Sequence, residues 1–202
     1  LRQQFASLKS SKIISAHVVT ICMLAGHYVL YAYFTPFLQE TLNANAFWIS
    51  VAYFVFGVSA VMGGGIGGLL ADRLGAQKTI LLVVGLFAIV LFSLPISTKV
   101  LYLFPTPMII WGMLSWALSP PQQSYLIATE PESAGIQQSF NNSALQLGIA
   151  LGSAVGGVVI QHSEITTNAY VGGIFAILAI VFAVFSITRK PITKKDGQKL
   201  AS

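Results

Sequence analysis

The sequence predicts an all-α polytopic membrane protein with six transmembrane helices. Hydrophobic residues make up 55% of the 202 residues and charged residues only 8%, which is too few charges to coat a soluble globule of this size. A spanning helix needs about 20 apolar residues, and the chain holds about six such runs with little sequence left over. We therefore expect a basic lead-in over 1–12, a six-helix bundle over 13–188 and a basic tail over 189–202.

The first span is expected over 13–38, directly after the basic lead-in. Its polar residues recur at helical spacing on one face: Thr20, His27, Tyr31 and Thr35. Pro36 predicts a bend near the far end of the span, since proline cannot donate the backbone hydrogen bond of a helix. The loop that follows carries Glu40 and no basic residue.

The second span is expected over 47–70 and contains three glycines that recur at spacings of seven and four: Gly57, Gly64 and Gly68. Small residues at such spacing let another helix backbone approach closely, so this strip predicts a helix-packing face. The third span, 79–94, and the sixth, 169–188, contain almost no polar residue. Both are therefore expected to face lipid.

The fourth span, expected over 100–127, is longer than a straight helix requires and contains four prolines: Pro105, Pro107, Pro120 and Pro121. Prolines within a span predict a kink or a break, here in its inner half. Its polar and aromatic residues form a second stripe: Trp111, Ser115, Ser119 and Gln122.

The fifth span, expected over 139–160, separates two faces. At about 100° per residue, one face groups Asn142, Gln146 and Ser153, and another groups Gly148, Gly152 and Gly156. The first predicts a surface toward water or substrate, and the second predicts a seam for close helix packing.

Charge sets the expected orientation. In a six-span arrangement all 11 Lys and Arg except Lys99 fall on one side of the membrane. The positive-inside rule makes that side cytoplasmic, so both chain ends are expected in the cytoplasm. The net charge of +5 is therefore attributed to topology rather than to nucleic-acid binding. The lone Cys22 excludes a disulfide within the chain, and no metal or other cofactor is expected.

The turn between the second and third spans carries a family resemblance. Gly68-Leu69-Leu70-Ala71-Asp72-Arg73-Leu74-Gly75, followed by Lys78, resembles the G-x-x-x-D-R-x-G-(basic) loop signature of the major facilitator superfamily of secondary transporters. In that family the signature recurs in the second half of the protein, and one helix before the motif with about four after it matches this second copy. The resemblance implies the C-terminal half of a twelve-helix fold, with a missing N-terminal six-helix half as partner. It also implies that Asp72 and Arg73 stabilise a cytoplasmic gate; the alternative is that they only anchor the turn at the membrane surface.

A second resemblance concerns function. The run from Ser139 to Gly148 and on to Gly156-Gly157 resembles the drug and sugar efflux branch of bacterial proton antiporters. It implies a bacterial inner-membrane protein that exports a drug, sugar or nucleoside-like molecule by alternating access. On this basis the substrate is expected among the polar stripes, at His27, Tyr31, Trp111, Gln122, Asn142 and Gln146.

Other classes of function remain to be weighed. An enzyme would need paired carboxylates, a His-rich cluster or a Ser/Lys dyad in the membrane, and the sequence shows none of them. The main alternative is a six-helix subunit or channel-like protein without its own transport cycle. No Asp or Glu lies deep in a span, so a proton-carrying carboxylate is expected in the missing half. His27 is the alternative carrier, unless it is a neutral histidine hydrogen-bonded to a neighbouring helix. Because the chain begins at Leu1 rather than Met, it is expected to be a fragment or processed piece.

Overall fold

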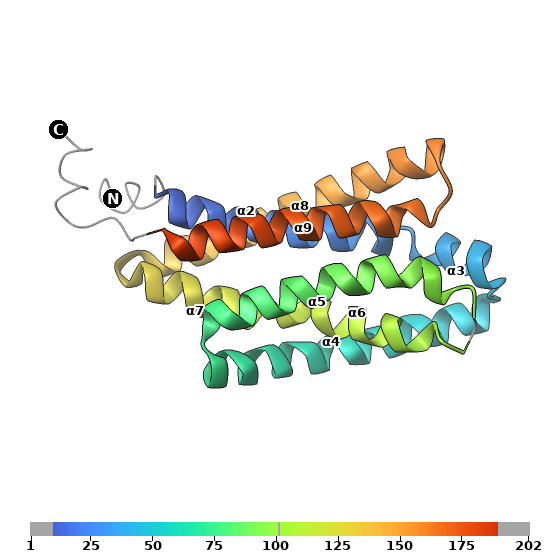
Figure 1. Cartoon of the computed structure of the whole chain (residues 1–202), viewed down its shortest axis with the longest axis horizontal. Helices are drawn as coiled ribbons and strands as arrows, with labels where there is room; N and C mark the ends of the chain where they lie inside the picture. Colours follow the sequence, from blue (N-terminus) through green and yellow to red (C-terminus); the bar gives the residue numbers. More distant parts are fainter. Residues whose placement is uncertain (1–9, 101, 190–202) are drawn as a thin grey trace.

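The structure is a computed structural model that describes residues 10–100 and 102–189, in which every regular element is a helix (Figure 1). The predicted basic lead-in over 1–12 and tail over 189–202 lie almost wholly outside the described residues. In chain order the elements are α2 (Ser11–Tyr31), α3 (Phe34–Leu42), α4 (Ala46–Leu74), α5 (Ala76–Ser97), α6 (Pro105–Ala117), α7 (Ser119–Thr129), the short 3-10 helix η2 (Pro131–Ser133), α8 (Ala134–His162) and α9 (Thr167–Thr188).

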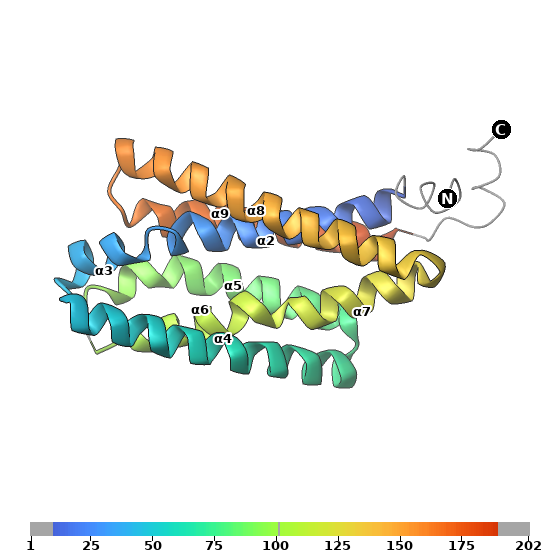
Figure 2. The same ribbon diagram turned by 180° about the vertical axis from the view of Figure 1, so that it is seen from behind.

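Five helices of the described chain are long and apolar enough to cross a membrane, namely α2, α4, α5, α8 and α9. They correspond to the first, second, third, fifth and sixth predicted spans. The fourth predicted span consists of two shorter helices, α6 and α7, which follow one another along the long axis of the bundle (Figure 2). The all-helical, apolar architecture of a polytopic membrane protein is therefore confirmed.

The first span is interrupted where its proline requires it. Pro36 lies in the first turn of α3, and the break between α2 and α3 falls at Ala32 and Tyr33. Proline has no N–H for the carbonyl four residues earlier, and its ring collides with that carbonyl. In this span the carbonyl belongs to Ala32, so the predicted bend occurs one turn before the proline.

The break between α6 and α7, at Leu118, is also caused by a proline, and a glycine of α4 lies against it. Pro121 occupies the position whose N–H would otherwise bond to the Ala117 carbonyl. Gly67 of α4 lies so close to this carbonyl oxygen that a Cβ atom at position 67 would collide with it. A glycine C–H that approaches a carbonyl oxygen makes a weak favourable contact. The predicted break in the fourth span is confirmed, and it lies against α4.

Helix α2 packs against both α8 and α9. Gly148, Gly152 and Gly156 of α8 face α2 carbonyls, and a Cβ atom at Gly148 would stand 2.7 Å from the carbonyl oxygen of Ile21. The predicted glycine seam of the fifth span is confirmed. From α9, the buried Asn168 donates through Nδ2 to the carbonyl of Val29, 2.8 Å away, which ties α9 to the same helix.

Within the described residues, the glycine strip predicted on the second span makes no close helix contact, and a Cβ atom at Gly68 would only reach Pro120 of α7 at 3.9 Å. A Cβ atom at Gly57 or Gly64 would meet nothing within 4 Å. The close approach uses Gly63 and Gly67 instead, which lie against the backbone of α6 at Met113 and Ala117. Glycines stand at positions 63, 64, 65, 67 and 68, so residues four apart can form a smooth strip on more than one face of the helix.

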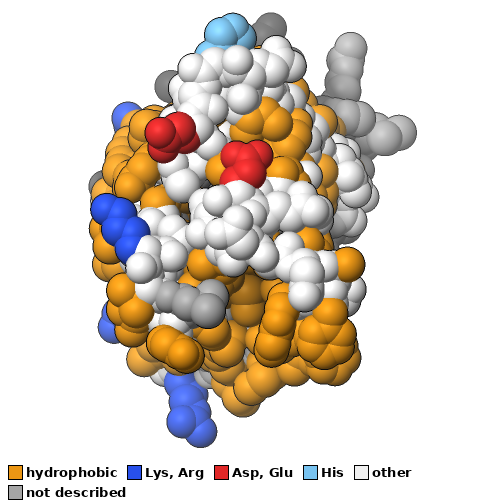
Figure 3. All heavy atoms as spheres, turned by 90° about the vertical axis from the view of Figure 1, so that its right-hand side faces the viewer, with side chains coloured by type: hydrophobic (Ala, Val, Ile, Leu, Met, Phe, Trp, Pro, Cys, Tyr) orange, Lys and Arg blue, Asp and Glu red, His pale blue; other side chains and the backbone are white. Residues whose placement is uncertain are grey.

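The bundle has two unlike broad faces. Helices α5 and α9 lie side by side on one face, as expected for the third and sixth spans, and their outward side chains are large and apolar (Figure 1). Helices α4 and α8 run along the opposite face (Figure 2). Only 22% of the most apolar stretch of α4, and the same share of that of α8, is buried, against 56% for α5 and 33% for α9. Hydrophobic side chains also reach much of the surface at the end near α3 (Figure 3). We call the exposed side of α4 and α8 the open face.

The α4 packing face gives a testable prediction. Gly63→Ala places a methyl group against the Met113 carbonyl, and overpacking of this kind costs about 1–3 kcal/mol of folding free energy. Gly65→Ala, with nothing within 4 Å of its added Cβ, is the matched control, and there the higher helix propensity of alanine leaves stability unchanged or improved. Thermal unfolding in detergent should show a lower midpoint for Gly63→Ala alone. Equal midpoints for the two variants would contradict this packing.

Candidate functional site

Aromatic side chains gather around His27 of α2. The imidazole stacks on Tyr31 with ring centres 4.9 Å apart, and its centre lies 5.2 Å from that of Trp111 in α6. We call the whole group the aromatic cluster; its other rings are Tyr28, Phe34, Tyr53, Phe56 and Phe87. Helices α2 to α6 all contribute, so this cluster packs five helices together next to the break between α2 and α3.

A hydrogen bond fixes the tautomer of His27. Nδ1 of His27 lies 3.0 Å from Ser115 Oγ, and Ser115 Oγ lies 2.6 Å from the carbonyl oxygen of Trp111. A serine hydroxyl has one hydrogen, and a carbonyl can only accept, so Ser115 donates to Trp111 and accepts from His27. The assignment places a hydrogen on Nδ1 of His27. The side chain is 3% exposed and is held by α6, as the hydrogen-bonded alternative from the sequence requires.

Two other predicted substrate-binding residues are also buried in this chain. Trp111 is fully buried, and its indole N–H meets no acceptor within the described residues. Gln122 of α7 is 2% exposed and donates through Nε2 to the carbonyl of Ala16, 2.6 Å away. Tyr31 is partly exposed. Of the residues predicted on the first and fourth spans, Tyr31 is thus the one with open surface.

A small pocket lies beside the aromatic cluster, where the predicted polar stripes of the first and fourth spans meet α8. Its volume is about 30 Å³, and we call it the polar pocket. Its polar lining comes from α2, α6, α7 and α8: Thr20, Ser115, Ser119, Gln122 and Asn141. Thr20 Oγ1 donates to Asn141 Oδ1 at 2.7 Å, which closes one side. The space suits about one water molecule or one small polar substituent of a larger molecule.

The fifth span meets this pocket through a different asparagine from the one predicted. Asn141 is buried against α2, whereas Asn142 and Gln146 are exposed on the open face. Asn141 precedes Gly148 by one heptad, and the glycine seam faces α2, so its position relative to the seam could have identified it from sequence. Gln137, one turn earlier, also faces α2 and lies 3.0 Å from Nε2 of His17.

The predicted gating pair lies apart from these residues. Asp72 and Arg73 form part of the last turn of α4, and both are exposed. Within the described part of the chain, neither side chain makes a hydrogen bond or an ion pair. Gly75, which follows, has φ of +85°, a conformation that glycine adopts without the penalty a Cβ atom imposes. The last glycine of the D-R-x-G motif therefore shapes the tight turn into α5.

Few titratable groups lie around the aromatic cluster and the polar pocket. Within residues 10–100 and 102–189, no three His, Cys, Asp or Glu side chains lie together in a way that could hold a metal ion. Glu130, outside the spans, has its pKa raised by burial and by the neighbouring charge of Glu132. What the arrangement offers is neutral hydrogen bonding and aromatic surface.

Comparisons with known proteins agree with this architecture. The Major Facilitator Superfamily matches residues 17–201. Similar proteins include an uncharacterized MFS-type transporter, YbcL, of Bacillus subtilis (28% identity over 191 residues) and the inner membrane transport protein YdhP of Escherichia coli K12 (29% over 196 residues). These alignments cover 95% and 96% of this chain but 49% and 50% of the relatives, so the chain spans about half their length. With the family matched over nearly all of its residues, the chain belongs to the major facilitator superfamily.

Proposed function

We propose that this chain is the C-terminal six-helix half of a secondary transporter, which exports a small molecule by alternating access coupled to protons. The observation that carries the proposal is the combination of a family match over 17–201 with coverage of only half of each relative. In this family the two halves are related by an axis along the membrane normal, and substrate binds between them. A chain of this length would therefore supply one wall of the site.

The open face is where we place the missing N-terminal half. Asn142 and Gln146 are exposed there on α8, and an unsatisfied amide facing lipid costs several kcal/mol. On α4, a Cβ atom added at Gly57 or Gly64 would meet nothing within 4 Å, and the large apolar side chains of Phe54 and Val61 are exposed. A second half would cover both features and pair the amides with substrate, water or its own polar groups.

The exposure of each predicted side chain decides which residues we propose to contact the substrate. We propose that Asn142 and Gln146 touch the substrate directly and that Tyr31 presents part of its ring. His27, Trp111 and Gln122 are buried in this chain, so they would hold that surface in place, or reach the substrate after a movement of α6 and α7. The neutral amide and aromatic lining suits a drug, sugar or nucleoside-like molecule, which is also the class implied by the efflux resemblance.

Proton coupling is assigned to the missing half. The described acidic residues lie at helix ends or in loops: Glu40, Asp72, Glu130, Glu132 and Glu164. His27 is committed to Ser115 and enclosed by rings, which supports a structural role. A carboxylate of the other half would then carry the proton.

We also propose a bacterial inner-membrane location with both ends in the cytoplasm, from the placement of basic residues. Replacing the lone Cys22 with Ala and introducing Asn43→Cys or Gln77→Cys tests the orientation. Both positions are exposed, and they stand at opposite ends of α4. In intact cells a membrane-impermeant maleimide should label position 43 and should reach position 77 only after the cells are opened. External labelling of position 77 would reverse the topology.

Transport should require both halves. Vesicles containing only this chain are expected to show no saturable uptake against a pH gradient, whereas vesicles that also contain a complementary N-terminal half should transport. Robust transport by this chain as a monomer would defeat the half-transporter proposal. Assembly with another protein, but no transport by any pairing, would favour the alternative of a six-helix subunit.

The same vesicles test the role of His27. His27→Gln keeps a hydrogen-bonding group beside Ser115 but removes the titrating ring. Transport by this variant is expected to keep its dependence on the pH gradient, because the proton is carried elsewhere. Transport that persists without pH dependence would instead make His27 the carrier.

Gln146→Ala and Asp72→Asn should separate binding from the conformational cycle. A neutral hydrogen bond contributes about 0.5–1.5 kcal/mol, so Gln146→Ala should weaken substrate binding by roughly tenfold at most. Asp72 lies in the last turn of α4 and does not line the polar pocket, so Asp72→Asn should leave binding nearly intact while transport falls. Equilibrium binding and transport rate, measured on both variants in the two-half protein, check this contrast. Lost binding in Asp72→Asn would move that residue into the substrate site.

A further inference from the structure

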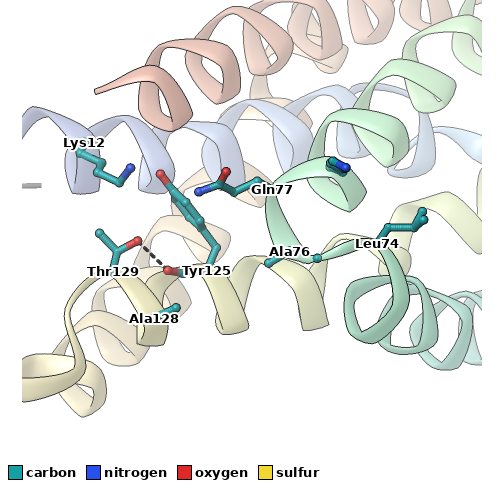
Figure 4. Close-up of a pocket in the computed structure, with 9 residues that line it drawn as sticks. Lys12, Leu74, Ala76, Gln77, Tyr125, Ala128 and Thr129 are labelled. Carbon is teal, nitrogen blue, oxygen red and sulfur yellow. Dashed lines mark hydrogen bonds between the residues drawn. The ribbon is translucent and has the colours of Figure 1, made fainter. Parts of the chain in front are cut away.

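A pocket of about 480 Å³ opens between the first turn of α2, the start of α5 and the end of α7 (Figure 4). Lys12, Gln77 and Tyr125 point toward one another across it. Lys78 and Thr129 also line it. None of these residues belongs to the aromatic cluster or the polar pocket, and the proposed transport cycle leaves this space without a role.

Lys12 is the unusual member of this lining because it is 7% exposed. Its Nζ donates to the carbonyl of Arg189 at 3.0 Å and lies 5.4 Å from the centre of the Tyr125 ring. These contacts leave N–H groups of the ammonium free. Within the described residues neither Lys12 nor Lys78 makes an ion pair. A buried ammonium without an opposite charge is costly, so an anion in the pocket would stabilise it.

The start of α5 adds donors to the same pocket. Ala76, Gln77 and Lys78 form its first turn, and Gly75 before them supplies no side-chain cap. The first helical N–H groups have no partner within their own helix, and the positive end of the helix dipole favours negative charge. No acidic residue occupies this turn. The nearest acidic residues in sequence, Asp72 and Glu130, are not part of the lining.

From the two lysines, the free helix N–H groups and the absence of an acid from the lining, we propose that this pocket binds a phosphate group. Phosphate oxygens accept several charge-assisted hydrogen bonds at once, from ammonium groups and from backbone N–H groups. The pocket lies level with the charged Asp72-Arg73 turn, which must sit at a membrane surface. The phosphate can therefore belong to the headgroup of an anionic phospholipid or to a soluble ion.

The test measures binding of phosphatidylglycerol to the intact protein in neutral detergent by native mass spectrometry. Lys12→Gln and Lys78→Gln each remove one pocket cation. Lys99→Gln, at the opposite end of the bundle, removes an exposed charge and is the matched control. Lys12→Gln should weaken binding about tenfold and Lys78→Gln several-fold, since each loses a charge-assisted contact. The control should bind like the wild type.

Competition with inorganic phosphate separates the two sources. Displacement of the lipid by phosphate shows that the pocket takes the phosphate group itself, whereas lysine-dependent binding that resists phosphate identifies a lipid site. Lys78 is exposed, so Lys78→Gln decides the question even where Lys12→Gln does not fold. Wild-type binding of both ligands by Lys78→Gln overturns the proposal, as does an equal loss in Lys99→Gln.

Discussion

Close backbone contact between helices is the constraint on which this bundle depends. Lipid tails are as apolar as leucine, so burying one apolar helix against another gains little once both are in the membrane. Dispersion contacts and polar bonds between helices must supply the stability instead. Glycines provide the approach within two groups of helices: α2 with α8 and α9, and α4 with α6. Helix α5 contacts α9 in the first group and α6 in the second, and so connects the two groups.

The same constraint explains where the polar groups lie. Thr20 with Asn141, and His17 with Gln137, bond across the α2 and α8 seam, where water does not compete. Polar side chains inside a membrane are expensive unless paired, and the paired ones here hold helices in register. Within the described residues the side chains of Asn142 and Gln146 make no such bond, although Asn142 is adjacent to Asn141, which does. That contrast within one helix distinguishes the packing face of α8 from its exposed polar face.

Hydropathy and proline placement predicted much of the fold, because both act through local physics. A long run of apolar residues that crosses lipid is expected to be helical, because its backbone groups must bond to one another. Pro36 and Pro121 each remove a helical hydrogen bond whatever the tertiary contacts are. The choice of face was harder. Helical periodicity shows that Gly57 and Gly64 share a side, as do Gly63 and Gly67, but the neighbour that selects one side is a distant segment.

The candidate site shows the same limit. The sequence placed polar residues on the helices that line the polar pocket, yet it could not show that His27 and Trp111 would pack into a closed cluster. That outcome depends on five helices meeting at once. Helical periodicity also grouped Asn142 with Gln146 on one face of the fifth span, whereas the contact with α2 is made by Asn141. A rotation of one residue about a helix axis, about 100°, decides between packing and exposure.

The Ala117 carbonyl has a consequence for how this sequence can vary. Pro121 withholds the amide that would bond to its oxygen, and Gly67 comes from another helix to lie against the same atom. An amide restored at position 121 would compete for that oxygen, and any side chain at position 67 would block it. Substitutions at these two positions are therefore not independent, although the residues belong to different spans and do not succeed one another in the chain. A substitution that restored the helical hydrogen bond in the fourth span would therefore also change the contact that packs the second span against it.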